Sequence, residues 1–419
     1  MMLFKDYSKK SLWNLSIIGL YIILIYLPDI TRYKNIVMGL IGATALWYLV
    51  RDFKTICKIF KNNLSFSLLF LLLVIGYSIV ISVEPSISIK EINKPILNGL
   101  LLFSVTFPIV LYKEKPADIA KMVMVAFAIG LLILMISNIV QYYFEYQKNM
   151  LPFTWKSQYF HRELSYALLF FFPIILIFCS FPKQHRIVHW SILIVVLFLF
   201  FTSILGTLAR GAWVSLAITI LLFLVFNRRW LLIIAISCSS LLLYISITHN
   251  VSDRFIPEYL RGKLTQINSG DRFNNGTQGS ALDIIFEQPI KGYGYGNQLY
   301  HNIYNKQVEK HPEWTFKKSI GPHNIFLAFW FAGGILGLFG LLYFCSSIIA
   351  QSIQLIRKNQ GIIRQAALVL LMSFLGVYVL RGLFENAYIN QVGILVGLML
   401  ALRHALRNNQ SVTPSEKQQ

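Results

Sequence analysis

The sequence predicts an all-α polytopic membrane protein with about twelve transmembrane helices and one long loop outside the lipid. Hydrophobic residues make up 56% of the 419 residues and charged residues only 13%, and the mean hydropathy is +0.60. A soluble domain carries about 25% charged residues, so this chain has too few charges to cover a water-exposed surface of its size. The composition excludes a cytosolic enzyme, a disordered chain and a nucleic-acid-binding module.

The predicted spans are apolar runs close to the ~20 residues that a helix needs to cross the hydrocarbon. In chain order they cover residues 13–28, 35–50, 64–82, 96–112, 120–141, 165–181, 187–207, 211–226, 230–247, 322–347, 366–383 and 388–402. The chain is thereby divided into nine spans in 1–247, a large loop in 248–320, three spans in 321–402 and a tail in 403–419.

The positions of the basic residues predict the sidedness of these spans. With the N-terminus inside, 20 of the 38 Lys and Arg residues fall in inner segments, nine in short outer loops and nine in the long loop. Cytoplasmic segments of membrane proteins are enriched in Lys and Arg, and long loops are left out of the count. Both termini are therefore expected inside and the long loop outside. The net charge of +20 is explained by topology and does not indicate a nucleic-acid partner.

The long loop is expected to be folded, because it carries periodic apolar residues. Apolar residues recur at three- and four-residue steps in 253–267, which predicts an amphipathic helix lying on the bilayer surface. A second helix is predicted at 278–288, where Pro289 ends it, and a third at 297–308. Within the loop, Asn275-Gly276-Thr277 matches a glycosylation sequon, but Asn-Gly favours a turn.

A glycine-rich segment, Lys291-Gly292-Tyr293-Gly294-Tyr295-Gly296-Asn297, follows the second predicted loop helix. One interpretation is a tight turn in which glycines adopt positive φ. The alternative is a backbone that closely approaches a ligand, with Lys291 nearby and Tyr293 stacking on a sugar face. Further aromatic residues either extend such a surface or anchor the loop at the membrane interface. These residues are Tyr300, Tyr304, Trp314 and Phe316.

Two arginines are candidates for binding phosphate. Arg210 lies at the outer end of a helical hairpin, where it either snorkels to lipid head groups or binds an anion together with the start of the next helix. Arg272 lies in a turn-rich stretch and forms either a salt bridge to Asp271 or Asp283 or a second phosphate clamp. Both functional interpretations rest on the planar guanidinium, which fits two phosphate oxygens.

His323 is the candidate general base. It lies in Gly321-Pro322-His323-Asn324, directly before the tenth predicted span. Proline marks a helix start, so we expect the imidazole in the first turn, where the positive helix end favours the neutral form. The alternative is a structural histidine. Asn324 in the same motif is a secondary candidate, and so are His161 and Arg162 in another outer loop.

Several kinds of site are missing from the sequence. There is no D-x-D, H-E-x-x-H or G-x-S-x-G motif, and the four cysteines form no C-x-x-C pair. The acids of the outer loops are scattered singly, unlike the ligands of a metal site. We therefore expect chemistry that needs neither a metal nor another cofactor.

The motifs together resemble the O-antigen ligase/polymerase superfamily, and its ligase branch in particular. The resemblance is carried by Gly321–Leu327 running into Phe331–Leu338, and by three further stretches. These are Asn274–Gly279, Glu287–Asn297 and Thr207–Trp213. The stretch Arg381–Tyr388 lacks an acid that some relatives carry near its end, so the resemblance assigns no role to an acid there.

The resemblance implies a GT-C-like glycosyltransferase of the bacterial inner membrane, with the long loop in the periplasm. Such enzymes transfer O-antigen polysaccharide from undecaprenyl diphosphate to lipid A–core, without a metal and with inversion at the anomeric carbon. The essential arginines and histidine of the family match Arg210, Arg272 and His323. The implied partners are the lipid-linked donor, lipid A–core and membrane lipids.

Three other functions stay open at this point. An O-antigen polymerase would use the same donor but extend the glycan, and a protein-glycosylating ligase of the same superfamily is a further alternative. A lipid or polysaccharide transporter would place charged residues near the middle of its spans. The predicted spans are almost free of charge at their centres, which argues against a transporter.

Overall fold

The computed structural model describes residues 7–149, 164–180, 186–207, 209–234, 270–385 and 389–412. Within these ranges the regular elements are all helical, without a strand. Eight helices are long and apolar enough to cross a membrane, and Leu164–Ser180 and Arg210–Phe226 are shorter apolar helices. The all-α, multi-pass class is therefore confirmed. The number twelve stays a prediction, because most of span 230–247 lies outside the described residues.

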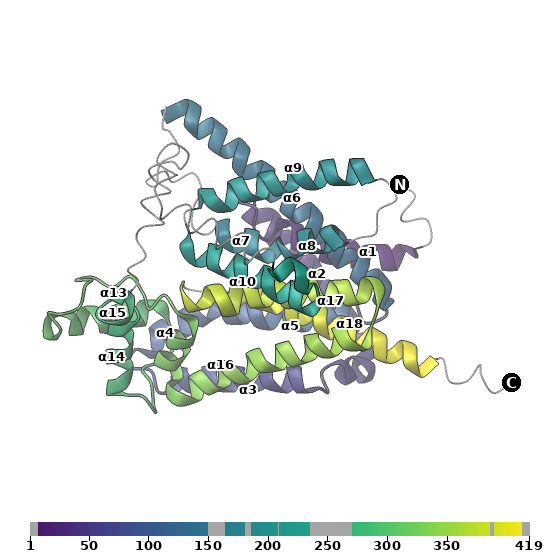
Figure 1. Cartoon of the computed structure of the whole chain (residues 1–419). Helices are drawn as coiled ribbons and strands as arrows, with labels where there is room; N and C mark the ends of the chain where they lie inside the picture. The colour runs from purple at the N-terminus through teal and green to yellow at the C-terminus, as the bar shows by residue number, and fades with distance from the viewer. Residues whose placement is uncertain are drawn as a thin grey trace.

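The chain forms a helical bundle with a smaller helical unit at one end (Figure 1). The first half of the bundle comprises α1 (Lys9–Leu24), α2 (Thr31–Ile59), α3 (Asn63–Val80), α4 (Pro85–Ile92), the π-helical η2 (Asn93–Leu101), α5 (Leu102–Val110), α6 (Pro116–Asn149), α7 (Leu164–Phe171), α8 (Pro173–Ser180), α9 (Arg186–Gly206) and α10 (Arg210–Phe226). The second half comprises α16 (Ile325–Lys358), α17 (Gly361–Phe374), the π-helical η4 (Leu375–Leu380), the short turns η5 (Arg381–Leu383) and η6 (Ile389–Gln391), and α18 (Val392–Val412).

The two C-terminal spans form the centre of the bundle. In Gly361–Leu383 and Ile389–Asn409, 78% of an apolar stretch of 18 residues is buried. The corresponding share is 22% in Thr31–Ile59 and Ile187–Gly206. A helix that is apolar all round and buried belongs in a core, whereas one with exposed apolar faces belongs next to lipid. The last two spans are therefore enclosed by helices whose outer faces suit the hydrocarbon.

Two predicted spans in the first half of the chain are interrupted. Span 165–181 consists of α7 and α8, which meet at Pro173, because proline lacks the N–H that would continue the first helix. Span 96–112 begins within η2, where the helix widens and Gly99 packs directly against Asn390. A Cβ atom on Gly99 would lie only 2.6 Å from the Asn390 Cα. The lengths of the apolar runs predicted continuous helices, but the first of these helices is broken at Pro173 and the second is widened where Gly99 contacts Asn390.

The smaller unit comprises α13 (Gly270–Phe273), α14 (Gly279–Glu287), α15 (Asn297–Gln307) and the turn η3 (Val308–Lys310). It lies beside α4 and the start of α16, whereas α18 ends at the opposite end of the bundle (Figure 1). The unit has a core of its own, which Phe331 of α16 joins. Its α14 and α15 confirm the helices predicted at 278–288 and 297–308, whereas the helix predicted at 253–267 lies outside the described residues.

A kink in α16 fixes this unit to the bundle. Gly334 has φ 60° and ψ −150°, so two backbone carbonyls just before it lose their helical partners. The Tyr293 N–H donates to the Phe331 carbonyl over 2.8 Å, and Gly294 N–H donates to the next carbonyl, that of Ala332, over 2.9 Å. The glycine-rich segment therefore supplies the hydrogen bonds that the kinked helix lacks.

We predict that Gly334→Ala destabilises the protein. A Cβ atom at this position would lie 1.9 Å from the Ile290 carbonyl oxygen, and the backbone conformation is one that only glycine adopts readily, at a cost of about 1–3 kcal/mol for other residues. A thermal unfolding curve in detergent should shift to a clearly lower midpoint. Gly39→Ala, on a helix face where a Cβ has open space, is the matched control and should leave the midpoint unchanged or slightly higher. Equal midpoints for the two variants would contradict the proposed role of the kink.

Candidate active site

The turn Arg381–Glu385 contacts two of the predicted site residues, Arg272 and His323, and lies beside the helix start that carries the third, Arg210. It follows η4 and is closed by the N–H groups of Phe384 and Glu385, which donate to the Arg381 carbonyl over 2.9 and 3.0 Å. The turn presents two backbone carbonyls and one carboxylate to its surroundings. Arg272 of α13 and His323, just before α16, contact these groups, and the start of α10 lies beside the turn.

Arg272 contacts this turn directly. Its guanidinium donates to the Phe384 carbonyl over 3.0 Å, and Gln278 donates to the neighbouring Leu383 carbonyl over 2.8 Å. The Gln278 amide also lies 3.4 Å from the His323 carbonyl. Asp283, one of the two predicted salt-bridge partners of Arg272, instead accepts from the Trp314 ring over 2.9 Å. Arg272 and Gln278 therefore attach the smaller helical unit to the turn.

His323 contacts the same turn through Glu385. Its Nδ1 lies 3.1 Å from the Glu385 carboxylate, and the two side chains are only 19% and 10% exposed. Sequence analysis assigned no role to an acid here, so Glu385 is a residue that it missed. If Nδ1 carries the proton that the carboxylate accepts, Nε2 of the neutral ring is left with a free lone pair.

His323 was predicted to lie in the first turn of a helix, and this prediction is wrong. Helix α16 begins at Ile325, and the Asn324 side chain caps it by accepting the N–H groups of Phe326 and Leu327 over 2.9 and 3.3 Å. His323 precedes this cap and has a positive φ of 47°. Proline marked the approach to the helix but not its first residue, because the asparagine after it is the stronger N-cap. Asn324 thus has a capping function.

Arg210 is the first residue of α10, as the sequence predicted, and its side chain is exposed. The next residue, Gly211, lies against the turn: a Cβ built there would be 3.0 Å from the Phe384 Cβ and 3.8 Å from the Glu385 Cγ. The start of α10 therefore lies beside the turn that Arg272 and His323 contact.

Arg381 anchors the turn and is itself buried, with 3% exposure. Its guanidinium lies 4.1 Å from the centre of the Tyr166 ring, and its Nε donates to the Ser165 hydroxyl over 3.3 Å. In the sequence, Arg381 was only the first residue of the stretch 381–388, and no role was assigned to it. The contact between a desolvated arginine and an aromatic face is strong. Arg381 therefore holds the turn against Tyr166 and Ser165 of the bundle.

Two secondary candidates lie in the glycine-rich segment. Lys291 is exposed, and its role in ligand binding stays a prediction. Tyr293 is buried and stacks on Phe331, with ring centres 5.1 Å apart, while its hydroxyl donates to the Ile284 carbonyl and to Glu287 over 3.1 and 3.0 Å. The interpretation as a sugar-stacking tyrosine was wrong, because the glycines let the backbone approach α16 and Ser82 rather than a ligand. The tight turn with positive φ is confirmed at Gly292, Gly294 and Gly296.

The other loop aromatics are mostly interior residues as well. Tyr300, Tyr304 and Trp314 are buried in the core of the smaller unit, so neither sugar stacking nor membrane anchoring describes them. Phe316 is 36% exposed. The residues Asn274–Gly276 form a turn, as predicted. His161 and Arg162 lie outside the described residues, as does the side chain of Asp271.

The described residues contain no cluster of three or more His, Cys, Asp or Glu side chains that could hold a metal ion. The groups shown at the turn are the guanidinium groups of Arg272 and Arg381, the His323 imidazole and the Glu385 carboxylate. Arg210 lies at the adjacent start of α10. This set can bind an anion, accept a proton and orient the proton acceptor.

Comparisons with known proteins point to a single family. A family model described as O-Antigen ligase matches residues 195–342, a range that includes Arg210, Arg272 and His323. An O-antigen ligase of Salmonella typhimurium (strain LT2) is 39% identical over 398 residues, which cover 94% of this chain and 96% of the relative. An uncharacterized protein of Haemophilus influenzae is 25% identical over 78% of this chain and 82% of its own length.

We predict that Tyr293 acts through the fold. Burial and the hydrogen bond to Glu287 raise the pKa of Tyr293, so its hydroxyl stays a donor at neutral pH. Tyr293→Phe keeps the ring stacked and removes that donor, which should cost about 1 kcal/mol of unfolding free energy. Tyr293→Ala also leaves a cavity and should cost about 3–5 kcal/mol. Thermal unfolding in detergent measures both, and a Tyr293→Ala variant as stable as the unaltered protein would contradict the assignment.

Proposed function

Because the chain belongs to the O-antigen ligase family, we propose that it transfers O-antigen polysaccharide from undecaprenyl diphosphate to lipid A–core. We place this reaction on the periplasmic face of the bacterial inner membrane, with both termini in the cytoplasm. The excess of Lys and Arg on the opposite side supports that orientation. The proposed enzyme is an inverting glycosyltransferase that needs no metal.

One observation carries this proposal: Arg272, His323 and the start of α10 all meet the turn Arg381–Glu385. Arg272 binds a carbonyl of the turn over 3.0 Å, and His323 binds its carboxylate over 3.1 Å. These residues are distant in sequence and come from separate elements. A guanidinium, a proton acceptor and the helix start that carries Arg210 lie beside one turn, which suits a reaction in which a diphosphate leaves and a hydroxyl attacks.

In the proposed reaction, Arg210 and Arg272 bind the diphosphate of the donor. A hydroxyl of the acceptor sugar loses its proton to Nε2 of His323 as its oxygen forms a bond to the anomeric carbon. The bond from that carbon to the diphosphate oxygen breaks on the opposite face, and undecaprenyl diphosphate leaves with the electron pair. The guanidinium groups offset the negative charge that grows on the leaving oxygen.

Glu385 is the proposed positioning residue of this reaction. By accepting the Nδ1 proton it holds the imidazole in the tautomer whose Nε2 can take a proton. Its negative charge also stabilises the imidazolium that forms when the acceptor hydroxyl is deprotonated. Arg381, fixed over Tyr166, keeps the backbone of the turn in place and so determines where Glu385 and the Phe384 carbonyl lie.

We predict that Arg210→Ala, Arg272→Ala and His323→Ala each abolish most of the transfer. Loss of a proton acceptor costs about 10²–10⁴ in rate, and loss of a group that stabilises developing charge costs about 10²–10³. The assay follows polymer transfer from lipid-linked donor to lipid A–core in detergent with EDTA present. Lys310→Ala, an exposed cation of the same unit, is the control and should retain full activity.

Wild-type rates in all three variants would refute the assignment of these residues. Loss of transfer on adding EDTA to the unaltered protein would refute metal independence. A product in which the lipid-linked glycan itself is lengthened, with lipid A–core left unmodified, would identify an O-antigen polymerase instead.

We predict that Glu385→Gln lowers the kcat of transfer by at least about tenfold and leaves the KM for the lipid-linked donor unchanged. The amide cannot stabilise the imidazolium, so the step in which His323 takes the proton slows, whereas donor binding by Arg210 and Arg272 is retained. Glu385→Asp keeps the charge and should restore part of the rate. A Glu385→Gln variant in which kcat and KM both change, or a Glu385→Asp variant as slow as Glu385→Gln, would indicate that Glu385 serves only the fold.

A further inference from the structure

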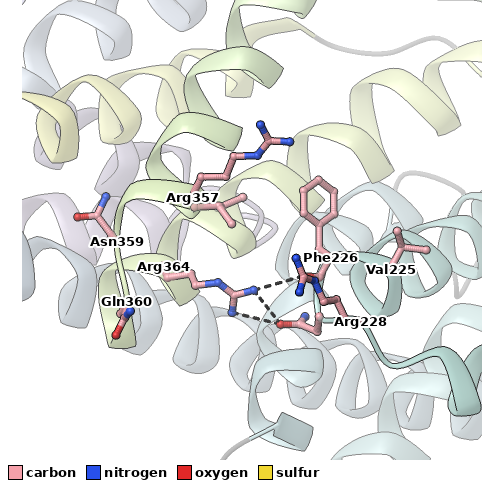
Figure 2. Close-up of a pocket in the computed structure, with 9 residues that line it drawn as sticks. Val225, Phe226, Arg228, Arg357, Asn359, Gln360 and Arg364 are labelled. Carbon is pink, nitrogen blue, oxygen red and sulfur yellow. Dashed lines mark hydrogen bonds between the residues drawn. The ribbon is translucent and has the colours of Figure 1, made fainter.

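A hollow lined by arginines lies at the end of the bundle remote from the candidate active site. It has a volume of about 620 Å³ and lies between the end of α10 and the connection from α16 to α17. Figure 2 shows Arg228, Arg357 and Arg364 around it, together with Phe226 and Val225. Small-molecule sites have volumes of about 300–1,000 Å³, so the hollow can hold a group of that size.

The hollow and the candidate active site lie on opposite sides of the bundle. Helix α16 has its start beside the smaller helical unit and ends at Lys358. From the kink at Gly334 to that end, a rise of 1.5 Å per residue gives about 36 Å, which exceeds the ~30 Å of a bilayer's hydrocarbon. The hollow is therefore separate from the place proposed for the donor diphosphate.

All the charged residues that line the hollow are positive. Three of its lining residues are arginines, and the rest of the described lining is apolar or carries a neutral amide: Val225, Phe226, Asn227, Ile356, Asn359 and Gln360. The ion pairs found among the described residues include none of the three arginines. An adjoining hollow of about 210 Å³ shares Asn227 and Arg364 and adds Arg229.

Arg364 gives the hollow a fixed wall. Its two terminal nitrogens both lie 3.2 Å from the Asn227 side-chain oxygen, and one donates to the Phe226 carbonyl over 3.3 Å. These bonds tie the start of α17 to the end of α10, as the dashed lines in Figure 2 show. They involve neutral acceptors, so the positive charge of Arg364 is retained.

The other two arginines are exposed and reach the hollow from either side. Arg357 lies at the end of α16. Arg228 follows α10 with φ 54°, at a helix end where glycine is the usual residue. Guanidinium groups bind phosphate through paired N–H groups, and the first turn of α17 adds unpaired backbone N–H groups of favourable polarity.

We propose that this hollow binds the phosphate of an anionic membrane phospholipid. Its place at one end of the membrane-spanning helices puts it at head-group level, where basic pockets between helices take anionic lipids. The apolar walls formed by Val225, Phe226 and Ile356, and the exposed Trp230 and Leu231 next along the chain, suit acyl chains beside the phosphate. Neither the candidate active site nor the ligase reaction assigns a ligand to this end.

Native mass spectrometry of the full-length protein in detergent tests this proposal with added phosphatidylglycerol, phosphatidylcholine or inorganic phosphate. We expect phosphatidylglycerol to bind in preference to phosphatidylcholine. The double variant Arg228→Gln/Arg357→Gln should bind phosphatidylglycerol at least about tenfold more weakly, since each cation near a lipid surface contributes appreciably. Arg364 is left intact because it joins two helices.

Lys54→Gln/Lys58→Gln is the matched control. It removes two exposed cations from α2 on the same predicted side, and neither of them lines the hollow. Its lipid binding should equal that of the unaltered protein, and Arg228→Lys/Arg357→Lys should retain most of the binding. If both Gln double variants lose binding equally, or neither loses any, the site is refuted. Binding of inorganic phosphate without binding of phosphatidylglycerol would refute a lipid ligand.

Discussion

A buried guanidinium over an aromatic ring is the contact on which the candidate site depends. Arg381 lies 4.1 Å from the centre of the Tyr166 ring and is almost fully buried, in a chain whose charged residues are otherwise concentrated outside the spans. A cation is costly in such surroundings unless its partners are well placed. The same turn carries the acceptors for Arg272 and His323. The strength of one contact in the bundle therefore sets the geometry of groups that approach from the smaller helical unit.

The kink in α16 is the second constraint, and it links the fold to the site. Because Gly334 breaks the helix, the carbonyls of Phe331 and Ala332 can bind the glycine-rich segment. That segment connects α14 and α15, and the chain preceding α14 carries Arg272. The glycines thus contribute to the site indirectly, by fixing the helical unit, and the close backbone approach that they allow is made to the protein itself.

The sequence was informative where local pattern determines structure. Pro289 marked the end of the predicted helix that became α14, and Arg210 was correctly expected at a helix start. It failed where contacts join distant positions: Glu385 and His323 are 62 residues apart, and neither periodicity nor a motif relates them. Tyr293 was misjudged for another reason. An aromatic ring with a polar hydroxyl suits a sugar, a membrane interface or a buried core equally well, and only packing against Phe331 distinguishes these environments.

The arginines show that the position of a charge matters more than its number. The net charge is +20. Orientation in the membrane requires only that exposed Lys and Arg residues be more numerous on the inner side, wherever they lie on that side. Topology does not explain the position of Arg364, which donates hydrogen bonds to neutral acceptors at the end of another helix. Arg228 and Arg357 line the same hollow as Arg364. Bringing like charges together opposes folding. An arrangement with that cost is more simply explained by an anion that offsets it than by orientation in the membrane alone.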